Sequence, residues 1–128
     1  MQNDNPIKIK AIDHLVIATA DIPRLQKFYE SVLGCHVERT LPNLGLVQMR
    51  AGQAMIDLVP YDGDNRPGQN MEHFCLLLEE WDLKAIKTHL MRNGVSVEGP
   101  SQRYGATGMG PSLYISDPDG NQIEIKGM

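Results

Sequence analysis

The feature that most constrains the fold is an internal repeat, in which one pattern of apolar runs around an amphipathic segment occurs twice. Each copy opens with an acidic residue and a histidine inside an apolar run, at residues 12–17 and 71–76. Each copy closes with a carboxylate at the centre of another apolar run, at residues 55–59 and 122–126. Ionisable side chains are costly to bury unless they are paired or bind a ligand, so these positions are the first candidates for a functional site.

The spacing of apolar residues predicts the same secondary structure in both copies. Asp21 is placed to cap a helix that ends at Gly34, and Asp82 and Gly94 occupy the matching positions of the second copy. The expected strands are residues 11–18, 37–39, 45–49 and 54–59 in the first copy, and 72–78, 96–98, 112–115 and 122–126 in the second. The order βαβββ is therefore predicted twice.

The length of 128 residues is that of one ordinary domain. We expect a single α+β domain over residues 1–128, with a first module at about 11–60 and a second module at about 71–127. Residues 60–70 are rich in turn formers and are interpreted as the linker between the modules. Neither module is large enough to bury a core alone, so the two are expected to fold together.

Side-chain alternation predicts where the ionisable residues of the repeat point. Successive residues of a strand face opposite sides of the sheet, so apolar neighbours such as Leu15 and Ile17 are expected to pack on the helices. The helices would then lie on the outer face of a cupped mixed sheet. The concave face is left for four side chains: His14, Asp57, His73 and Glu124. Two imidazoles and two carboxylates are a suitable ligand set for a divalent metal ion.

Composition and charge exclude other classes of function. The net charge is −4 and no run of Lys or Arg occurs, so neither nucleic acid nor a membrane surface is an expected partner. No apolar stretch has the length of a transmembrane helix, and the polar start of the chain does not resemble a signal peptide. Cys35 and Cys75 fit no disulfide framework. We therefore expect a cytoplasmic protein.

Four short motifs are the most distinctive parts of the sequence. They are Asp13-His14-Leu15, Phe28-Tyr29 with Leu33-Gly34, Glu72-His73-Phe74, and Asp117-Pro118-Asp119-Gly120-Asn121 followed by Ile123-Glu124-Ile125. Together they resemble the vicinal oxygen chelate superfamily, over about residues 11–126. That superfamily includes glyoxalase I, methylmalonyl-CoA epimerase, fosfomycin-resistance proteins, extradiol dioxygenases and bleomycin-binding proteins.

The resemblance implies which side chains hold the metal ion. His14, His73 and Glu124 match the three most regular ligands of the superfamily. Asp57 falls where glyoxalase I places a glutamate, and its side chain is one methylene shorter. Three roles stay open for Asp57: a direct ligand, a ligand through water, or a polar neighbour of the site. The ligand set does not choose among Ni²⁺, Zn²⁺, Fe²⁺, Co²⁺ and Mn²⁺.

The resemblance also implies a lyase or isomerase reaction of the glyoxalase type, like that of lactoylglutathione lyase. Two adjacent oxygens of a small substrate would bind the metal ion, which stabilises the negative charge that develops on them. Glu124 or Asp57 would be the catalytic carboxylate that moves a proton between neighbouring carbons. The hemithioacetal of a 2-oxoaldehyde and a thiol would leave as a thioester.

Other reactions of the superfamily stay open as alternatives. An epimerase would also use a carboxylate base beside the metal ion. Fosfomycin-modifying enzymes share the three ligands, but they usually carry Thr two residues after the first histidine, where this sequence has Val16. A bleomycin-type antibiotic-binding protein uses the fold without metal ligands, and the presence of His14, His73 and Glu124 argues against it.

Substrate contacts are expected around a glycine-rich segment, residues 105–110, which is interpreted as a mobile loop at the rim of the cup. Tyr114 is predicted on the concave face because it alternates with apolar neighbours, and Arg103 and Thr107 are further candidates. Single-domain members of the superfamily commonly form homodimers in which two chains complete each cup. The site is then shared, with one histidine and one carboxylate from each module; an intrachain site stays open as well.

Overall fold

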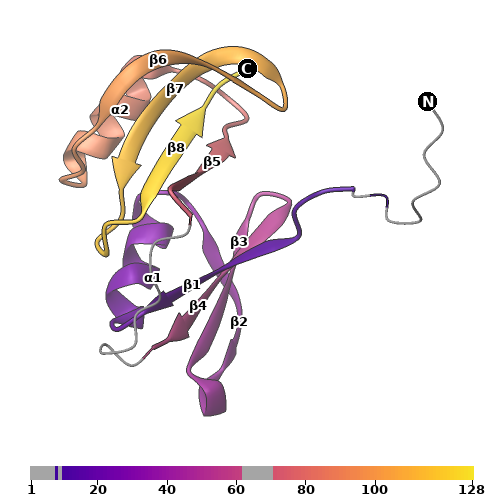
Figure 1. Cartoon of the computed structure of the whole chain (residues 1–128). Coiled ribbons are helices and arrows are strands. Elements are labelled where there is room, and N and C mark those ends of the chain that lie inside the picture. The colour runs from indigo at the N-terminus through magenta and orange to yellow at the C-terminus, as the bar shows by residue number, and fades with distance from the viewer. Residues whose placement is uncertain (1–7, 9, 62–70) are drawn as a thin grey trace.

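The computed structural model describes residues 8, 10–61 and 71–128. Two helices and eight strands follow the order βαβββ twice, with one 3₁₀ turn, η1, in the first module (Figure 1). The elements of the first module are β1 (His14–Thr19), α1 (Ile22–Ser31), β2 (His36–Leu41), η1 (Pro42–Leu44), β3 (Leu46–Ala51) and β4 (Ala54–Pro60). Those of the second are β5 (His73–Leu77), α2 (Leu83–Arg92), β6 (Glu98–Gly105), β7 (Gly108–Ser116) and β8 (Gln122–Lys126). The predicted α+β class and its two βαβββ modules are confirmed.

The strands form two separate four-stranded sheets of the same topology, in the orders β1-β4-β3-β2 and β5-β8-β7-β6. The first strand of each module runs parallel to the last, and the other neighbours are antiparallel. This register sets Val16 opposite Asp57 in one sheet and Cys75 opposite Glu124 in the other. In both sheets, therefore, the histidine at the start of the first strand lies two residues before the position that pairs with the carboxylate of the last strand.

Both helices begin and end where the sequence predicts. The carboxylate of Asp21 accepts a hydrogen bond from the backbone N–H of Arg24, and that of Asp82 accepts one from Ala85. Beyond the last turns, Gly34 and Gly94 adopt φ angles of 72° and 70°, a left-handed conformation that glycine takes without a Cβ penalty. These signals set both ends of each helix, so that α1 lies between β1 and β2 in the chain and α2 lies between β5 and β6.

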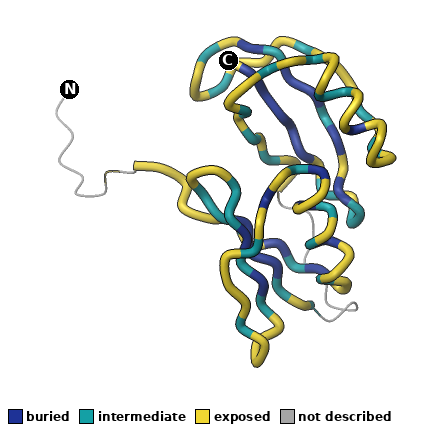
Figure 2. Tube along the Cα trace, turned by 180° about the vertical axis from the view of Figure 1, so that it is seen from behind, coloured by how far each residue is buried: buried dark blue, intermediate teal, exposed yellow. Residues whose placement is uncertain are grey.

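The apolar faces of both sheets share one core. The apolar neighbours of Asp57 and Glu124 are buried in this core, as predicted, and the two carboxylates are buried as well: the neighbours are Ile56, Leu58, Ile123 and Ile125. Buried positions run along the central strands of both sheets, whereas the outer face of α2 is exposed (Figure 2). Burial of these side chains is the main favourable contribution to folding.

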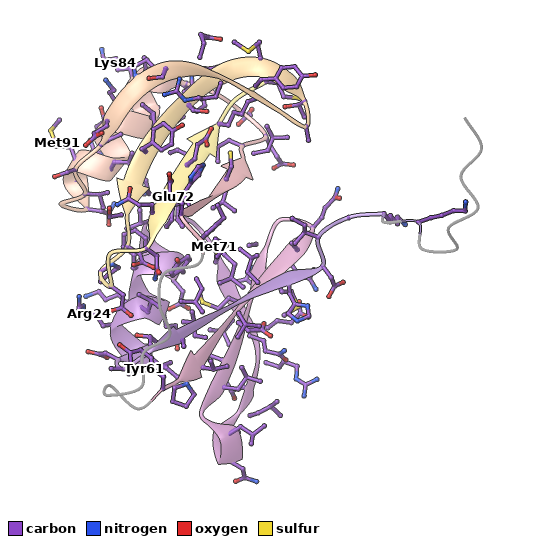
Figure 3. The ribbon with its side chains drawn as sticks, in the orientation of Figure 1. Arg24, Tyr61, Met71, Glu72, Lys84 and Met91 are labelled. Atoms are coloured by element: carbon purple, nitrogen blue, oxygen red, sulfur yellow. The ribbon has the colours of Figure 1, made fainter. Side chains whose placement is uncertain are left out.

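Helix α1 links the two modules, although it packs on β2 and β4 of the first sheet. Its buried Tyr29 hydroxyl donates to Asp117 Oδ2 at 2.8 Å, in the turn between β7 and β8. Arg24, labelled in Figure 3, donates to the carbonyl oxygen of Pro118 in the same turn. The carbonyl oxygen of Val32, after α1, accepts a hydrogen bond from His89 of α2 at 2.9 Å. None of the helices that the structure describes is both long and apolar enough to cross a membrane.

The glycine-rich segment departs from its sequence-based interpretation as a mobile loop. Residues 105–108 form a tight turn between β6 and β7, which are paired from Glu98–Tyr114 to Gly105–Gly108 with one bulge. The predicted strand 96–98 overlaps β6 only at Glu98, so residues 96 and 97 are not in a strand as predicted. Both β6 and β7 reach into the glycine-rich segment, because its glycines leave room for close approach of neighbouring backbone and side chains. The expected linker lies mostly at residues 62–70, outside the described residues.

Candidate metal and substrate site

The second sheet brings His73 and Glu124 into direct contact. His73 Nε2 lies 3.1 Å from Glu124 Oε1, and the Ser112 hydroxyl donates to Glu124 Oε2 at 2.5 Å. The other ring nitrogen of His73, Nδ1, hydrogen bonds to Glu72 Oε1 at 2.6 Å. A carboxylate only accepts, so both ring nitrogens of His73 lie where an N–H can donate, Nδ1 to Glu72 and Nε2 to Glu124. In the protonated imidazole a proton on Nε2 joins the pair, and in the neutral ring with Nδ1–H the Nε2 lone pair and Glu124 Oε1 are two donor atoms that a metal ion could bind.

The protonation of this pair follows from its surroundings. Burial tends to raise the pKa of Glu124, but hydrogen bonds from Ser112 and His73 outweigh it and lower that pKa below its ordinary value. The hydrogen bond to Glu72 raises the pKa of His73, with burial opposing it and the charge of Glu124 adding to it. Glu124 is therefore an ionised carboxylate at neutral pH, although its side chain is only 8% exposed.

The first sheet holds the other histidine and carboxylate. His14 Nδ1 hydrogen bonds to Asp13 Oδ2 at 2.8 Å, the same arrangement as that of His73 with the preceding glutamate. The hydrogen bond to Asp13 raises the pKa of His14, and the charge of Asp57 raises it further. Asp57 is 5% exposed; its Oδ2 accepts from Gln48 at 3.1 Å, while its buried Oδ1 has no hydrogen-bond partner among the described residues.

The unpartnered oxygen of Asp57 is a notable feature, because buried polar atoms in folded proteins are nearly always hydrogen bonded. An unsatisfied carboxylate oxygen costs free energy unless a ligand, a cation or water meets it. Carboxylate oxygen and imidazole nitrogen both suit divalent transition metals. The chemistry of these donors therefore fits the metal ion that the sequence predicts.

The four predicted ligands are divided between the two sheets. His14 and Asp57 lie on the first, and His73 and Glu124 on the second. Within the part of the chain that the structure describes, no three His, Cys, Asp or Glu side chains gather closely enough to hold a metal ion. Each chain thus carries two pairs of candidate ligands, one pair on each sheet, and we call each pair a half-site. The assignment of these residues as ligands stays a prediction.

The predicted substrate contacts lie on the second sheet. Tyr114 pairs with Glu124 in the sheet register, and its ring centre is 6.0 Å from that of His73. Arg103 Nε donates to the Tyr114 hydroxyl at 2.9 Å. Thr107, in the turn of the hairpin, accepts a hydrogen bond from Lys126 at 3.2 Å. Arg103 and Tyr114 therefore adjoin the half-site of His73, whereas Thr107 contacts a lysine that the sequence-based reasoning missed.

Three residues of the site were missed: Ser112, Gln48 and Lys126. Strand alternation carries a signal for two of them, because Ser112 shares a face with Tyr114, and Lys126 shares one with Glu124. Gln48 could be found only from the pairing of β3 with β4, which sets it opposite Asp57.

With this geometry established, the sequence can be compared with known proteins. Residues 11–125 match the Glyoxalase/Bleomycin resistance protein/Dioxygenase superfamily. The chain belongs to this superfamily. Its members are typically dependent on divalent metal ions, and they include enzymes such as lactoylglutathione lyase.

Individual relatives agree with this assignment. The chain is 35% identical to Virulence protein STM3117 of Salmonella typhimurium over 123 residues, which are 91% of this chain and 83% of that protein. An integron cassette protein from the mobile metagenome of V. cholerae has 35% identity and a TM-score of 0.79, with 94% of this chain and 97% of the other covered. Lactoylglutathione lyase from Agrobacterium tumefaciens has 25% identity and a TM-score of 0.68, with 96% of each chain covered.

Proposed function

We propose that this protein is a metal-dependent lyase or isomerase of the glyoxalase type, which works as a homodimer with two shared sites. The observation that carries the proposal is the position of His73 Nε2, 3.1 Å from Oε1 of the buried Glu124 carboxylate. The buried, unpartnered oxygen of Asp57 supports the same reading for the other half-site. Each complete site would combine His14 and Asp57 of one chain with the second half-site of its partner.

The free edges of the two sheets support the dimer. Among the described residues, β1 pairs only with β4 and β5 pairs only with β8, so these two strands are edges of their sheets, as β2 and β6 are at the opposite sides. Apolar side chains on or beside these strands are about half exposed: Val16 at 54%, Met71 at 52% and Leu77 at 49%. Open edges with apolar side chains favour pairing with another chain. A two-fold dimer would cover both edges of each chain with the matching edges of its partner.

The residues of a complete site have distinct roles in the proposed reaction. The bound metal ion supplies Lewis-acid stabilisation of negative charge on the substrate oxygens. His14, His73, Glu124 and, directly or through water, Asp57 would hold it. Their preceding carboxylates, Asp13 and Glu72, keep Nδ1 of each imidazole protonated so that Nε2 stays free to bind.

Glu124 is the proposed base. Its lowered pKa keeps the carboxylate ionised at neutral pH, which a base requires. Ser112 holds Oε2, so that Oε1 on the His73 side remains for exchange of a proton with the substrate. In a hemithioacetal, the carboxylate would take the proton from the carbon that bears sulfur and return it to the adjacent carbonyl carbon, while the hydroxyl proton passes to the oxygen of that former carbonyl. The product is a thioester, and no other reactant is consumed.

Metal analysis and turnover test this function together. Purified protein is expected to bind a divalent metal ion and to convert methylglyoxal and glutathione to a thioester, measured by absorbance with each metal ion in turn. His14→Ala and His73→Ala should each lose metal and turnover, whereas the exposed His36 offers a control, His36→Ala, that keeps both. Protein that binds no metal ion would contradict the site. Bound metal without thiol-dependent turnover would contradict the glyoxalase assignment alone.

A further inference from the structure

Lys126 is a buried cation on the same face of β8 as Glu124. It is only 3% exposed, although a lysine side chain ends in an ammonium group with three N–H donors. Successive residues on one face of a strand are about 7 Å apart, which is the spacing of Lys126 and Glu124 along β8, and Nζ lies beside Thr107 and Gly127. Lysine is almost never fully buried in proteins unless it is paired. The burial of Lys126 therefore needs a physical explanation.

The β6–β7 hairpin is shaped around this lysine. A Cβ added at Gly110 would lie 3.1 Å from Lys126 Nζ and 2.2 Å from the carbonyl oxygen of Gly127, so no side chain fits there. At Gly105, the nearest atoms to an added Cβ are the Lys126 side-chain carbons, at 3.7 and 3.8 Å. The glycine-rich segment is thus a cradle for the lysine side chain.

None of the ion pairs formed by the described residues involves Lys126. The nearest carboxylate along the strand is Glu124, and its two oxygens are used by Ser112 and His73. Within residues 8, 10–61 and 71–128, no carboxylate therefore neutralises the charge of Lys126 by direct contact. Burial of a cation without a partner is costly, and an anion that binds to it removes much of that cost.

The present contacts of the ammonium are weak. Lys126 Nζ donates to Thr107 Oγ1 at 3.2 Å and to the carbonyl oxygen of Gly127 at 3.3 Å, both at the long end of the hydrogen-bond range. An ammonium has three N–H donors, and these contacts use two. Hydrogen bonds from an ammonium to a carboxylate are shorter and about twice as strong as neutral ones. An anionic ligand would therefore compete well for Nζ.

We propose that Lys126 binds a carboxylate of the substrate, about one side-chain spacing beyond Glu124 and on the side away from His73. This inference rests on the proposed function, because it assumes that the other end of the substrate binds at the metal site. Leu77, opposite Lys126 in the register and 49% exposed, would contact the apolar carbons between the two ends. A singly charged carboxylate fits better than a dianionic phosphonate, because Glu124 repels the second charge.

Two hydroxamates that differ in one charge test the proposal on the metal-loaded protein. Acetohydroxamate offers two adjacent oxygens and no charged tail, while succinyl monohydroxamate adds a carboxylate two methylenes away. Calorimetry should give at least ~10-fold tighter binding of the second compound to the native protein, from one charge-assisted hydrogen bond. In Lys126→Met this advantage should disappear, and in Lys126→Arg it should largely remain. Equal affinities of the two compounds for the native protein would overturn the proposal.

A second measurement needs neither a substitution nor a metal ion. The lysine ε-methylene resonances of the native protein are followed by NMR as succinamate, neutral succinamide or methylphosphonate is added. Succinamate alone should shift one buried lysine signal. No shift, or a larger response to methylphosphonate, would overturn the carboxylate assignment. If succinamate shifts the signal but neither hydroxamate binds to protein treated with metal, the metal-dependent function fails and the anion site stands.

Discussion

The imidazoles of His14 and His73 are oriented alike, although they lie on different sheets. Each hydrogen bonds through Nδ1 to the carboxylate just before it in the chain, Asp13 or Glu72. The repeat in the sequence predicted the two histidines, but not this pairing, because an adjacent acidic residue can equally point into solvent. Ser112 was not predicted for a related reason. Its hydrogen bond to Glu124 depends on the pairing of β7 with β8, and a local sequence pattern does not reveal that pairing.

Ser112→Ala tests the support of Glu124. Ser112 is fully buried and donates to a charged carboxylate, so its loss should lower the free energy of unfolding by about 1.5–3 kcal/mol. Urea denaturation at neutral pH measures this change. Ser116→Ala is a matched control on the same face of β7, where the residue is exposed, and it should change stability by less than about 0.5 kcal/mol. Equal effects would contradict the assigned role.

At the scale of elements, the hairpin of β6 and β7 shows where prediction from sequence stopped. Glycine-rich runs are typical of loops, and alternation of apolar residues is absent from residues 99–111. The segment nevertheless forms strands, because its glycines let the backbone and Lys126 pack closely and the pairing with β7 supplies the hydrogen bonds. Helix ends were predicted well, since caps and terminal glycines are local signals.

Gly110→Ala tests the close packing of this hairpin. The added methyl group would lie 2.2 Å from a backbone oxygen, so the strands must shift, at a cost of about 1–3 kcal/mol in stability. Gly105→Ala is the matched control in the same hairpin, because its added Cβ makes only ordinary contacts at 3.7 Å. Thermal denaturation should separate the two variants. A control that is as destabilised as Gly110→Ala would contradict the packing argument.

The contact between α1 and the β7–β8 turn predicts a response to alkaline pH. Burial raises the pKa of Tyr29 above its ordinary value of 10.0, and the charge of Asp117 raises it further. Below that ordinary value the phenol is protonated in both states, so its stabilising contribution is complete. As the pH rises above about 10, the unfolded chain releases the proton while the folded chain retains it, so stability falls.

Urea denaturation between about pH 8 and pH 11 should therefore show a steeper loss of stability in the native protein than in Tyr29→Phe. At neutral pH, Tyr29→Phe should be less stable by about 1–2 kcal/mol, because Asp117 Oδ2 loses one of its two donors and keeps only Asn121. Tyr104→Phe is the control, since Tyr104 is 80% exposed. A control that also flattens the alkaline profile would contradict the assignment to Tyr29.

At the scale of the whole molecule, the sequence predicted more of the fold than of the site. The repeat was sufficient for the two βαβββ modules, whose strands and caps are local. The assembly of the site depends on which sheet edges lie side by side. The sequences of β1 and β5 do not indicate which strands would lie beside their free edges. The division of His14 and Asp57 from His73 and Glu124 is the structural reason to expect a shared site.

Mixing of two inactive variants tests the shared metal site most directly. His14→Ala chains keep the half-site of His73, and His73→Ala chains keep the half-site of His14, so a mixed dimer would contain one complete site and one doubly altered site. After subunit exchange of equal amounts, about one quarter of all sites should be complete. Metal content per chain, measured by elemental analysis, should rise from near zero in each variant to about a quarter of the native value. A mixture that stays free of metal would contradict the account.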